Sequence, residues 1–392
     1  MKPRKIRENI YRMGSVDWDS RLFDALIPLP DGTSYNAYYI RGSERSVLID
    51  TVDPPMEQEL MGQLEGIDRL DYIISLHSEQ DHAGTIPEVL QKFPEAKVIT
   101  SPKGKNLLML HLDISEDVFQ CVADGEELSL GDKTLKFIYT PWVHWPETMV
   151  AYLKEDKILF SCDFLGSHYA SSELYVSDPG VVYEAAKRYF AEIMMPFRPL
   201  VKRNLDKLKE YDIEMIAPSH GQIYPDPSFI LDAYEVWVKG EPRNTVVIPY
   251  VSMHGSTGKM VEYLVSALVA RDIRVEQFNL AVTDIGKLAC SLVDAATVVV
   301  GSPTVLTGPH PYAAYAAFLA NALKPNTKFI SIVGSFGWGG KTVETLAGML
   351  PNLKAEIIPP VLCKGTPREA AYRELDTMAD TIAAKHKECG YS

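Results

Sequence analysis

Long apolar runs are missing from this sequence. No stretch approaches the roughly 18 consecutive apolar residues that a membrane-spanning helix needs. The basic N-terminal segment MKPRKIRENIYRMGSVDW is not followed by an apolar run of the length found in secretory signal peptides. We therefore expect a cytoplasmic protein without a membrane as partner.

Cysteine is also scarce, and no two cysteines form a C-x-x-C pair. An odd and dispersed set argues against a disulfide framework and against a thiolate-ligated zinc or iron–sulfur site. We expect ordinary buried or surface thiols at all five positions: Cys121, Cys162, Cys290, Cys363 and Cys389.

Basic residues are fewer than acidic residues, so the formal net charge is −13 at pH 7. Such an acidic chain is a poor partner for nucleic acid or for an anionic membrane. The content of 46% hydrophobic and 23% charged residues is typical of globular proteins. A length of 392 residues exceeds one ordinary core and favours two or three domains.

The first part of the chain contains short β-rich runs separated by turns and occasional helices. This pattern favours a layered αββα sandwich. The expected strands cover residues 35–40, 46–49, 71–76, 98–101, 135–140, 149–153, 158–161 and 215–217, and the expected helices 56–64, 181–193 and 201–211.

Strands and helices alternate regularly after residue 242, which predicts a doubly wound parallel sheet of flavodoxin-like size. We therefore place domains at residues 1–242 and 243–392. The expected strands are 245–251, 274–279, 296–301, 328–333 and 356–358, and the expected helices 259–271, 287–291, 313–322, 342–350 and 368–386.

A dense set of possible metal ligands follows the expected strand at residues 71–76. The motif is His77-Ser-Glu79-Gln-Asp81-His82. His144, Asp163 and His220 each lie just past another expected strand. Burying so many titratable groups is very costly without a cation, so the set predicts a site for two metals. Isolated histidines such as His111, His310 and His386 are expected to be surface or core residues.

The motif resembles the H-x-H-x-D-H pattern of the metallo-β-lactamase superfamily, with Glu79 in place of its second histidine. This H-x-E-x-D-H form, combined with the flavodoxin-like second half, is similar to the flavodiiron proteins, or A-type flavoproteins. The resemblance implies that His77, Glu79 and His144 hold one iron. It implies that Asp81, His82 and His220 hold the other, with Asp163 bridging both.

The residue types agree with this implication, because hard oxygen donors with imidazole suit iron and its redox cycling. The ligands alone leave zinc and manganese open. Weaker candidates for the surroundings of the site are His168, Trp145, Tyr189 and Phe190. For these four, core packing is an equally good interpretation.

Three loops of the second domain resemble the FMN-binding loops of flavodoxins. The first offers hydroxyls and backbone N–H groups to a phosphate at a helix N-terminus. It matches neither G-x-x-x-x-G-K-[ST] nor G-x-G-x-x-G. Two further loops would flank the flavin ring. The residues are Ser252, Met253, His254, Gly255, Ser256 and Thr257; Ser302, Pro303, Thr304, Val305, Leu306, Thr307 and Gly308; and Ser335, Phe336, Gly337, Trp338 and Gly339.

The resemblance implies an FMN-dependent diiron oxidoreductase that reduces dioxygen to water, nitric oxide to nitrous oxide, or both. Electrons would come from a separate carrier, either rubredoxin or a reduced deazaflavin coenzyme. It also implies a head-to-tail homodimer or a dimer of dimers. Two other interpretations remain open from the residues: a dinuclear-metal hydrolase, and a non-catalytic electron carrier or gas sensor.

Overall fold

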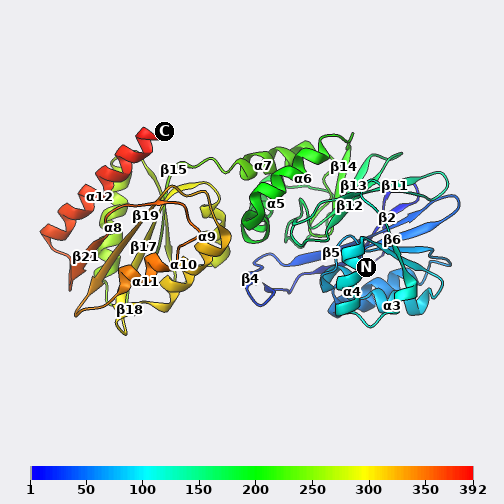
Figure 1. Cartoon of the computed structure of the whole chain (residues 1–392), viewed down its shortest axis with the longest axis horizontal. Coiled ribbons are helices and arrows are strands. Elements are labelled where there is room, and N and C mark those ends of the chain that lie inside the picture. Colours follow the sequence, from blue (N-terminus) through cyan, green and yellow to red (C-terminus); the bar gives the residue numbers. More distant parts are fainter. Residues whose placement is uncertain (1, 392) are drawn as a thin grey trace. The chain divides into compact units, whose positions relative to one another are not determined.

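The computed structural model describes residues 2–391 and divides the chain into two compact units. The first unit extends to Phe190 and resumes over Phe197–Val238, and the second contains Ala191–Pro196 and the chain from Lys239 onward (Figure 1). Across residues 2–391, no helix combines the length and the apolar character needed to cross a bilayer.

Two sheets form the middle layers of the first unit (Figure 1). One sheet contains β1 (Arg4–Arg7), β2 (Ile10–Asp17), β5 (Thr33–Arg41), β6 (Ser46–Ile49), β7 (Tyr72–Ile74), β8 (Lys97–Thr100) and β9 (Phe119–Cys121), in that order. The other contains β10 (Glu127–Ser129), β11 (Thr134–Tyr139), β12 (Met149–Leu153), β13 (Ile158–Cys162) and β14 (Met215–Pro218). A small hairpin consists of β3 (Leu22–Phe23) and β4 (Ile27–Pro28).

Strand β5 shows how side-chain alternation builds the layers. Tyr38 and Ile40 belong to the core between the two sheets, whereas Tyr35, Ala37 and Tyr39 belong to the core under the helices. Successive side chains of a strand point to opposite faces, so a strand covered on both faces presents apolar residues to both layers, as β5 does from Ala37 to Ile40. The helices of this unit are α1 (Glu57–Leu64), α2 (Gln80–Ala83), α3 (Ile86–Lys92), α4 (Pro102–His111), α5 (Pro179–Tyr189), α6 (Arg198–Leu208) and α7 (Ser228–Lys239).

The first unit differs from the sequence expectation at several elements. Further elements were not expected, and several of them are only two to four residues long: β1, β2, β3, β4, β9, β10, α2, α3, α4 and α7. The expected helix at 181–193 ends at Tyr189, and a π turn over Phe190–Met194 follows it. Pro196 lies in the next turn, and its ring and missing N–H prevent a continuous helix there.

The second unit has one sheet in the order β16-β15-β17-β19-β20, and its main strands are parallel (Figure 1). The strands are β15 (Arg243–Tyr250), β16 (Arg274–Asn279), β17 (Ala295–Val305), β18 (Gly308–Pro309), β19 (Phe329–Phe336), β20 (Glu356–Ile357) and β21 (Val361–Lys364). The helices are α8 (Ser256–Val269), α9 (Ile285–Leu292), α10 (Pro311–Leu323), α11 (Thr342–Gly348) and α12 (Glu369–Glu388).

Helices cover both faces of this sheet, as a doubly wound fold requires (Figure 1). Helices α8 and α12 pack together, and their residues Leu264 and Leu375 share a core with Val246 and Val299 of the strands. Helices α9, α10 and α11 lie on the other face.

Two strands of the second unit depart from the expected bounds. Strand β17 continues past residue 301 to Val305, because it pairs with β18 through a tight turn at Leu306 and Thr307. The last strand is divided into β20 and β21 by Pro359 and Pro360, which cannot donate to a β-ladder.

Candidate functional site

The seven expected ligands all follow strand ends in the first unit. His77 and Glu79 lie in the loop after β7, and Asp81 and His82 lie on the short helix α2 that follows. The other three ligands come from the second sheet, after β11, β13 and β14 respectively: His144, Asp163 and His220. Both sheets therefore contribute ligands to one place.

Four side chains form the first group of ligand atoms. His77 Nε2 lies 3.1 Å from Glu79 Oε2 and 3.4 Å from Asp163 Oδ2. His144 Nε2 lies 3.2 Å from each of the same two oxygens. Two imidazoles and two carboxylates thus present their donor atoms to a common centre.

The second group shares Asp163 with the first. His220 Nε2 lies 3.1 Å from Asp81 Oδ2 and 3.3 Å from Asp163 Oδ1. His82 Nε2 lies 3.3 Å from Asp81 Oδ1 and 2.9 Å from Asp163 Oδ1. His82 therefore turns toward this group, and the two oxygens of Asp163 face different groups.

The ligand atoms are arranged better for binding metal ions than for hydrogen bonds among themselves. Both carboxylate oxygens of Asp81 and of Asp163 and both ring nitrogens of His82 are buried, and within residues 2–391 none makes a hydrogen bond. Their contacts at 2.9–3.4 Å fall outside hydrogen-bond geometry. Unpaired buried carboxylates are costly, so the arrangement suits a pair of cations.

The electric field of the cluster also favours cations. Burial opposes a charged imidazole, yet the nearby carboxylates of Asp163 and Glu79 raise the pKa of His144 to about 9. Burial also opposes a charged His220, but the carboxylates of Asp163 and Asp81 raise its pKa to about 10. The nearby imidazoles hold the pKa of Glu79 far below its usual range, although burial acts in the opposite direction.

Two left-handed residues turn the chain at the site. Cys162 has φ +51° and directly precedes Asp163, and Asp50 has φ +54° at the end of β6. Non-glycine residues adopt this conformation at a cost of about 1–2 kcal/mol. Asp50 offsets this cost by accepting hydrogen bonds from the Leu76 N–H at 2.8 Å and from the Ser219 hydroxyl at 3.1 Å.

Side chains outside the ligand set hold the imidazoles in place. The Nδ1 of His77 lies 2.7 Å from Glu147 Oε1, which also accepts the Ser78 N–H at 3.1 Å. The Nδ1 of His220 lies 2.7 Å from the Ser34 carbonyl oxygen. Sequence reasoning missed Glu147 and Ser34; the only local signal for Glu147 is its place three residues after His144.

Three of the four weaker candidates lie beside the ligands. The ring of Trp145 is 5.0 Å from that of His77, and His168 is 4.8 Å from His220. Tyr189 is 4.9 Å from His168. Phe190 instead packs on two core aromatic residues, Tyr234 and Trp237, so its packing role is the better interpretation.

The three expected flavin loops meet at the carboxyl edge of the parallel sheet in the second unit. Gly255, with φ +85°, immediately precedes α8, and the Ser252 hydroxyl accepts the Gly258 N–H at 3.0 Å. The hydroxyls of Thr257 and Ser335 are 2.8 Å apart, which joins the first loop to the third. The second loop begins within β17 and contains its hairpin turn.

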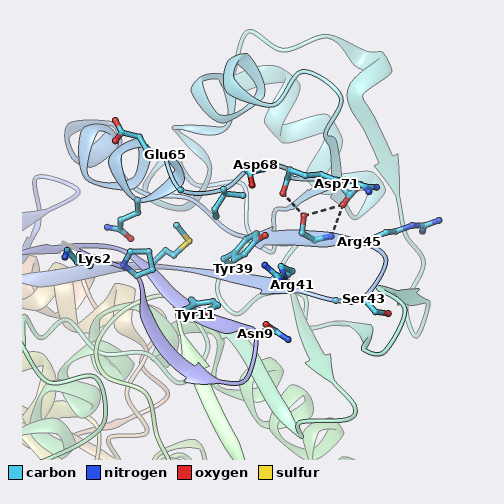
Figure 2. A pocket seen from close by; sticks show the side chains of 18 of the residues that line it. Lys2, Asn9, Tyr11, Tyr39, Arg41, Ser43, Arg45, Glu65, Asp68 and Asp71 are labelled. Atoms are coloured by element: carbon cyan, nitrogen blue, oxygen red, sulfur yellow. Dashed lines mark hydrogen bonds and ion pairs between the residues drawn. The ribbon is translucent and has the colours of Figure 1, made fainter.

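A separate hollow of about 710 Å³ lies elsewhere in the first unit (Figure 2). Its lining combines basic residues such as Arg41 and Arg45 with acidic residues such as Glu65 and Asp68. None of the seven expected ligands is among its lining residues. This hollow is therefore distinct from the metal-ligand cluster.

Comparisons with known proteins agree with the geometry. Residues 33–221 match the family model of ODP family beta lactamases. The nitric oxide reductase of Moorella thermoacetica is 34% identical to this chain, over 98% of this chain and 99% of that protein. The coenzyme F420H(2) oxidase of Methanothermobacter marburgensis is also 34% identical, over 88% of this chain and 89% of its own length.

A solved structure extends the likeness to both units. The rubredoxin oxygen:oxidoreductase from Desulfovibrio gigas matches with a TM-score of 0.95 and 32% identity, covering 98% of this chain and 99% of that one. The expected fold class and the expected oxidoreductase class are confirmed, and the hydrolase alternative is not favoured. The chain belongs to the flavodiiron proteins, or type A flavoproteins.

Proposed function

We propose that the seven ligands hold two irons, in the arrangement that the resemblance implies. His77, Glu79 and His144 hold one iron, and Asp163 is shared with the second. The second iron takes the remaining three ligands: Asp81, His82 and His220. The observation that carries this proposal is the convergence of both ligand groups on the two oxygens of Asp163, with buried donor atoms left unpaired.

The second unit holds FMN in this proposal, and we place the domain boundary at residue 242. The N-terminus of α8 and the hydroxyls of Ser252, Ser256 and Thr257 bind the phosphate. The turns around Leu306 and Trp338 flank the ring. Their side chains are 95% and 78% exposed, so they provide apolar surface for a flat aromatic group.

The irons and FMN, when bound, supply the one-electron chemistry that amino-acid side chains lack. The protein excludes bulk water from the reaction site with the rings of Phe23, Tyr35 and Trp145, which pack against the ligand imidazoles. Burial lowers the pKa of His168 and raises that of Tyr189, so both remain neutral beside the site. The Tyr189 hydroxyl is thus a protonated donor next to the ligands.

The substrates are dioxygen, nitric oxide or both, because relatives are named for each reaction. Reduction of dioxygen to water consumes four electrons and four protons. Reduction of two nitric oxide molecules to nitrous oxide and water consumes two of each. Both reactions need electrons delivered singly to a buried site and protons supplied by the protein.

The electron donor is rubredoxin or a reduced deazaflavin coenzyme, the donors named in two relatives. The chain acts in the cytoplasm as a head-to-tail homodimer or a dimer of dimers, without nucleic acid or membrane as partner. The net charge of −13 supports the last point. Exposed apolar residues within the flavin loops, among them Leu306 and Trp338, support an assembly in which these loops are covered.

The test is anaerobic turnover of chemically reduced protein loaded with iron and FMN, with dioxygen and nitric oxide added in separate runs. We expect rapid consumption of at least one gas, and loss of that activity in Glu79→Ala. The matched control is Glu127→Ala, which removes a surface ion pair with Lys154. Zinc in the purified protein together with no gas consumption would overturn the proposal in favour of a hydrolase.

A further inference from the structure

The two ligand groups differ in the hydrogen-bond partners of their imidazole Nδ1 atoms. In the first group, His77 directs Nε2 at the ligand oxygens, so its Nδ1 carries the proton and donates it to Glu147 at 2.7 Å. Both side chains are buried, with exposures of 0% and 1%. A carboxylate that accepts this bond makes the imidazole a stronger donor to a metal.

Among residues 2–391, the second group has no equivalent direct bond to a carboxylate. His220 donates from Nδ1 to the neutral carbonyl oxygen of Ser34 at 2.7 Å. Within residues 2–391, His82 Nδ1 makes no hydrogen bond. The nearby carboxylate of Asp50 is already bonded to the Leu76 N–H and the Ser219 hydroxyl.

The charges of the direct ligands do not distinguish the groups. Each group has two imidazoles and one carboxylate of its own, Glu79 or Asp81, and both groups lie within 3.4 Å of an Asp163 oxygen. Glu147 acts on His77 through a direct hydrogen bond, whereas the buried Asp50 carboxylate lies near His82 without bonding to it. An extra negative charge, poorly screened in a buried site, stabilises the more positive oxidation state of the nearer metal.

We propose that Glu147 is a positioning residue that, through His77, makes the two irons unequal. The iron held by His77, Glu79 and His144 then retains the ferric state longer than its neighbour. With two irons bound, the first electron from a reductant such as reduced FMN would go to the iron at Asp81, His82 and His220, and the second to the iron at His77. This inference rests on the proposed function, because it requires two irons at these ligands.

The substitution that isolates the charge is Glu147→Gln. An amide oxygen can still accept the bonds from His77 and Ser78, whereas the negative charge is removed. The matched control is Ser101→Ala, which removes the 3.2 Å hydrogen bond to the Glu147 carbonyl oxygen and leaves the carboxylate untouched. Ser101→Ala therefore shows the effect of holding the Glu147 segment less firmly while the charge of Glu147 is unchanged.

The measurement is a dithionite titration of the iron- and FMN-loaded protein, with the half-reduced iron pair followed by electron paramagnetic resonance. We expect Glu147→Gln to raise the lower of the two iron potentials and to leave the upper one nearly unchanged. The equilibrium constant for forming the half-reduced pair should fall about tenfold, which is about 59 mV for one electron. Ser101→Ala should behave like the wild type.

If Glu147→Gln binds iron poorly, cobalt binding provides a second measurement. Cobalt(II) added to the metal-free protein reports each site by its visible spectrum, and Glu147→Gln should weaken one binding step about 10–100-fold. The inference is overturned if two irons are bound and both potentials shift equally or not at all. It is also overturned if both cobalt steps weaken together. A wild-type protein that binds no metal pair would instead show that the proposed function is wrong.

Discussion

The Nδ1 of His220 lies 2.7 Å from the carbonyl oxygen of Ser34, so a ligand that follows the second sheet is oriented by a strand of the first. Asn36, two residues further along β5, donates from Nδ2 to the carbonyl oxygens of Pro218 and Gly221, both at 2.8 Å. Its own side-chain oxygen accepts two bonds from the buried Arg12, at 2.9 and 2.7 Å. The loop that carries His220 is thus fixed on both sides.

We therefore expect Asn36→Ala to destabilise the protein and to loosen His220. The change leaves two carbonyl groups without these partners and removes an acceptor from Arg12, at about 1–3 kcal/mol for an unsatisfied buried group. The free energy of unfolding, measured by denaturant titration, should fall by about 3 kcal/mol. Asn106→Ala, at an exposed position of α4, should change it by less than about 0.5 kcal/mol. Equal stability of the two variants would contradict this account of the loop.

Asp163→Asn should remove metal from both positions. The substitution preserves shape but takes away the only carboxylate shared by the two ligand groups among the described residues. We expect the bound iron, measured by elemental analysis, to fall to less than half of the wild-type content. Gas consumption should fall at least about 100-fold. Asp156→Asn, which removes a salt bridge to Lys133, should retain the full metal content. Full occupancy in Asp163→Asn would show that the bridge is not required.

Thr257→Val tests the link between two flavin loops. It removes the 2.8 Å contact between the hydroxyls of Thr257 and Ser335 while keeping the side-chain shape. The loss of about 0.5–1.5 kcal/mol should weaken FMN binding by roughly 2–13-fold, as measured by flavin fluorescence on dilution. Thr377→Val, on the surface of α12, is the control. Unchanged FMN affinity would place the flavin away from this loop.

Acid should destabilise the second unit through His386. Burial lowers the pKa of this imidazole to about 4, and its two nitrogens lie 2.7 Å from Thr297 Oγ1 and 2.8 Å from Asn244 Oδ1. The ordinary histidine pKa is about 6.5. Because the folded state disfavours the protonated form, its stabilising contribution is complete above pH ~6.5 and is lost as the pH falls toward about 4.

Thermal unfolding followed between about pH 7 and pH 4 checks this prediction. The wild type should lose stability on acidification, and His386→Gln should show a flatter dependence although it is less stable at neutral pH. His111→Gln, at an exposed position, should follow the wild-type curve. An identical slope in wild type and His386→Gln would exclude His386 as the cause.

The sequence was sufficient to predict the layers, because strand periodicity is a local signal. It also selected seven side chains that the structure brings together, and their binding of metal stays a prediction. The side chains that orient the ligands were not predictable in this way. Asn36 acts on residues more than 180 positions away, and its contacts exist only after the two sheets pack. Elements with weak periodicity were also missed. The division of the last strand follows from Pro359 and Pro360, which cannot donate to a β-ladder.

Each ligand group takes side chains from both sheets, so the separation of two irons held there would depend on how the sheets pack. Tyr38 of β5 lies in that core: its ring is 5.0 Å from Phe160, and its hydroxyl donates to the Pro218 carbonyl oxygen at 2.7 Å. Magnetic exchange between two irons is sensitive to small changes in their separation and in the angle at a bridging carboxylate. The exchange constant of the diferric protein should therefore report on the packing of a hydrophobic core that contains no ligand, and subtle core substitutions should be detectable in it before they alter the fold.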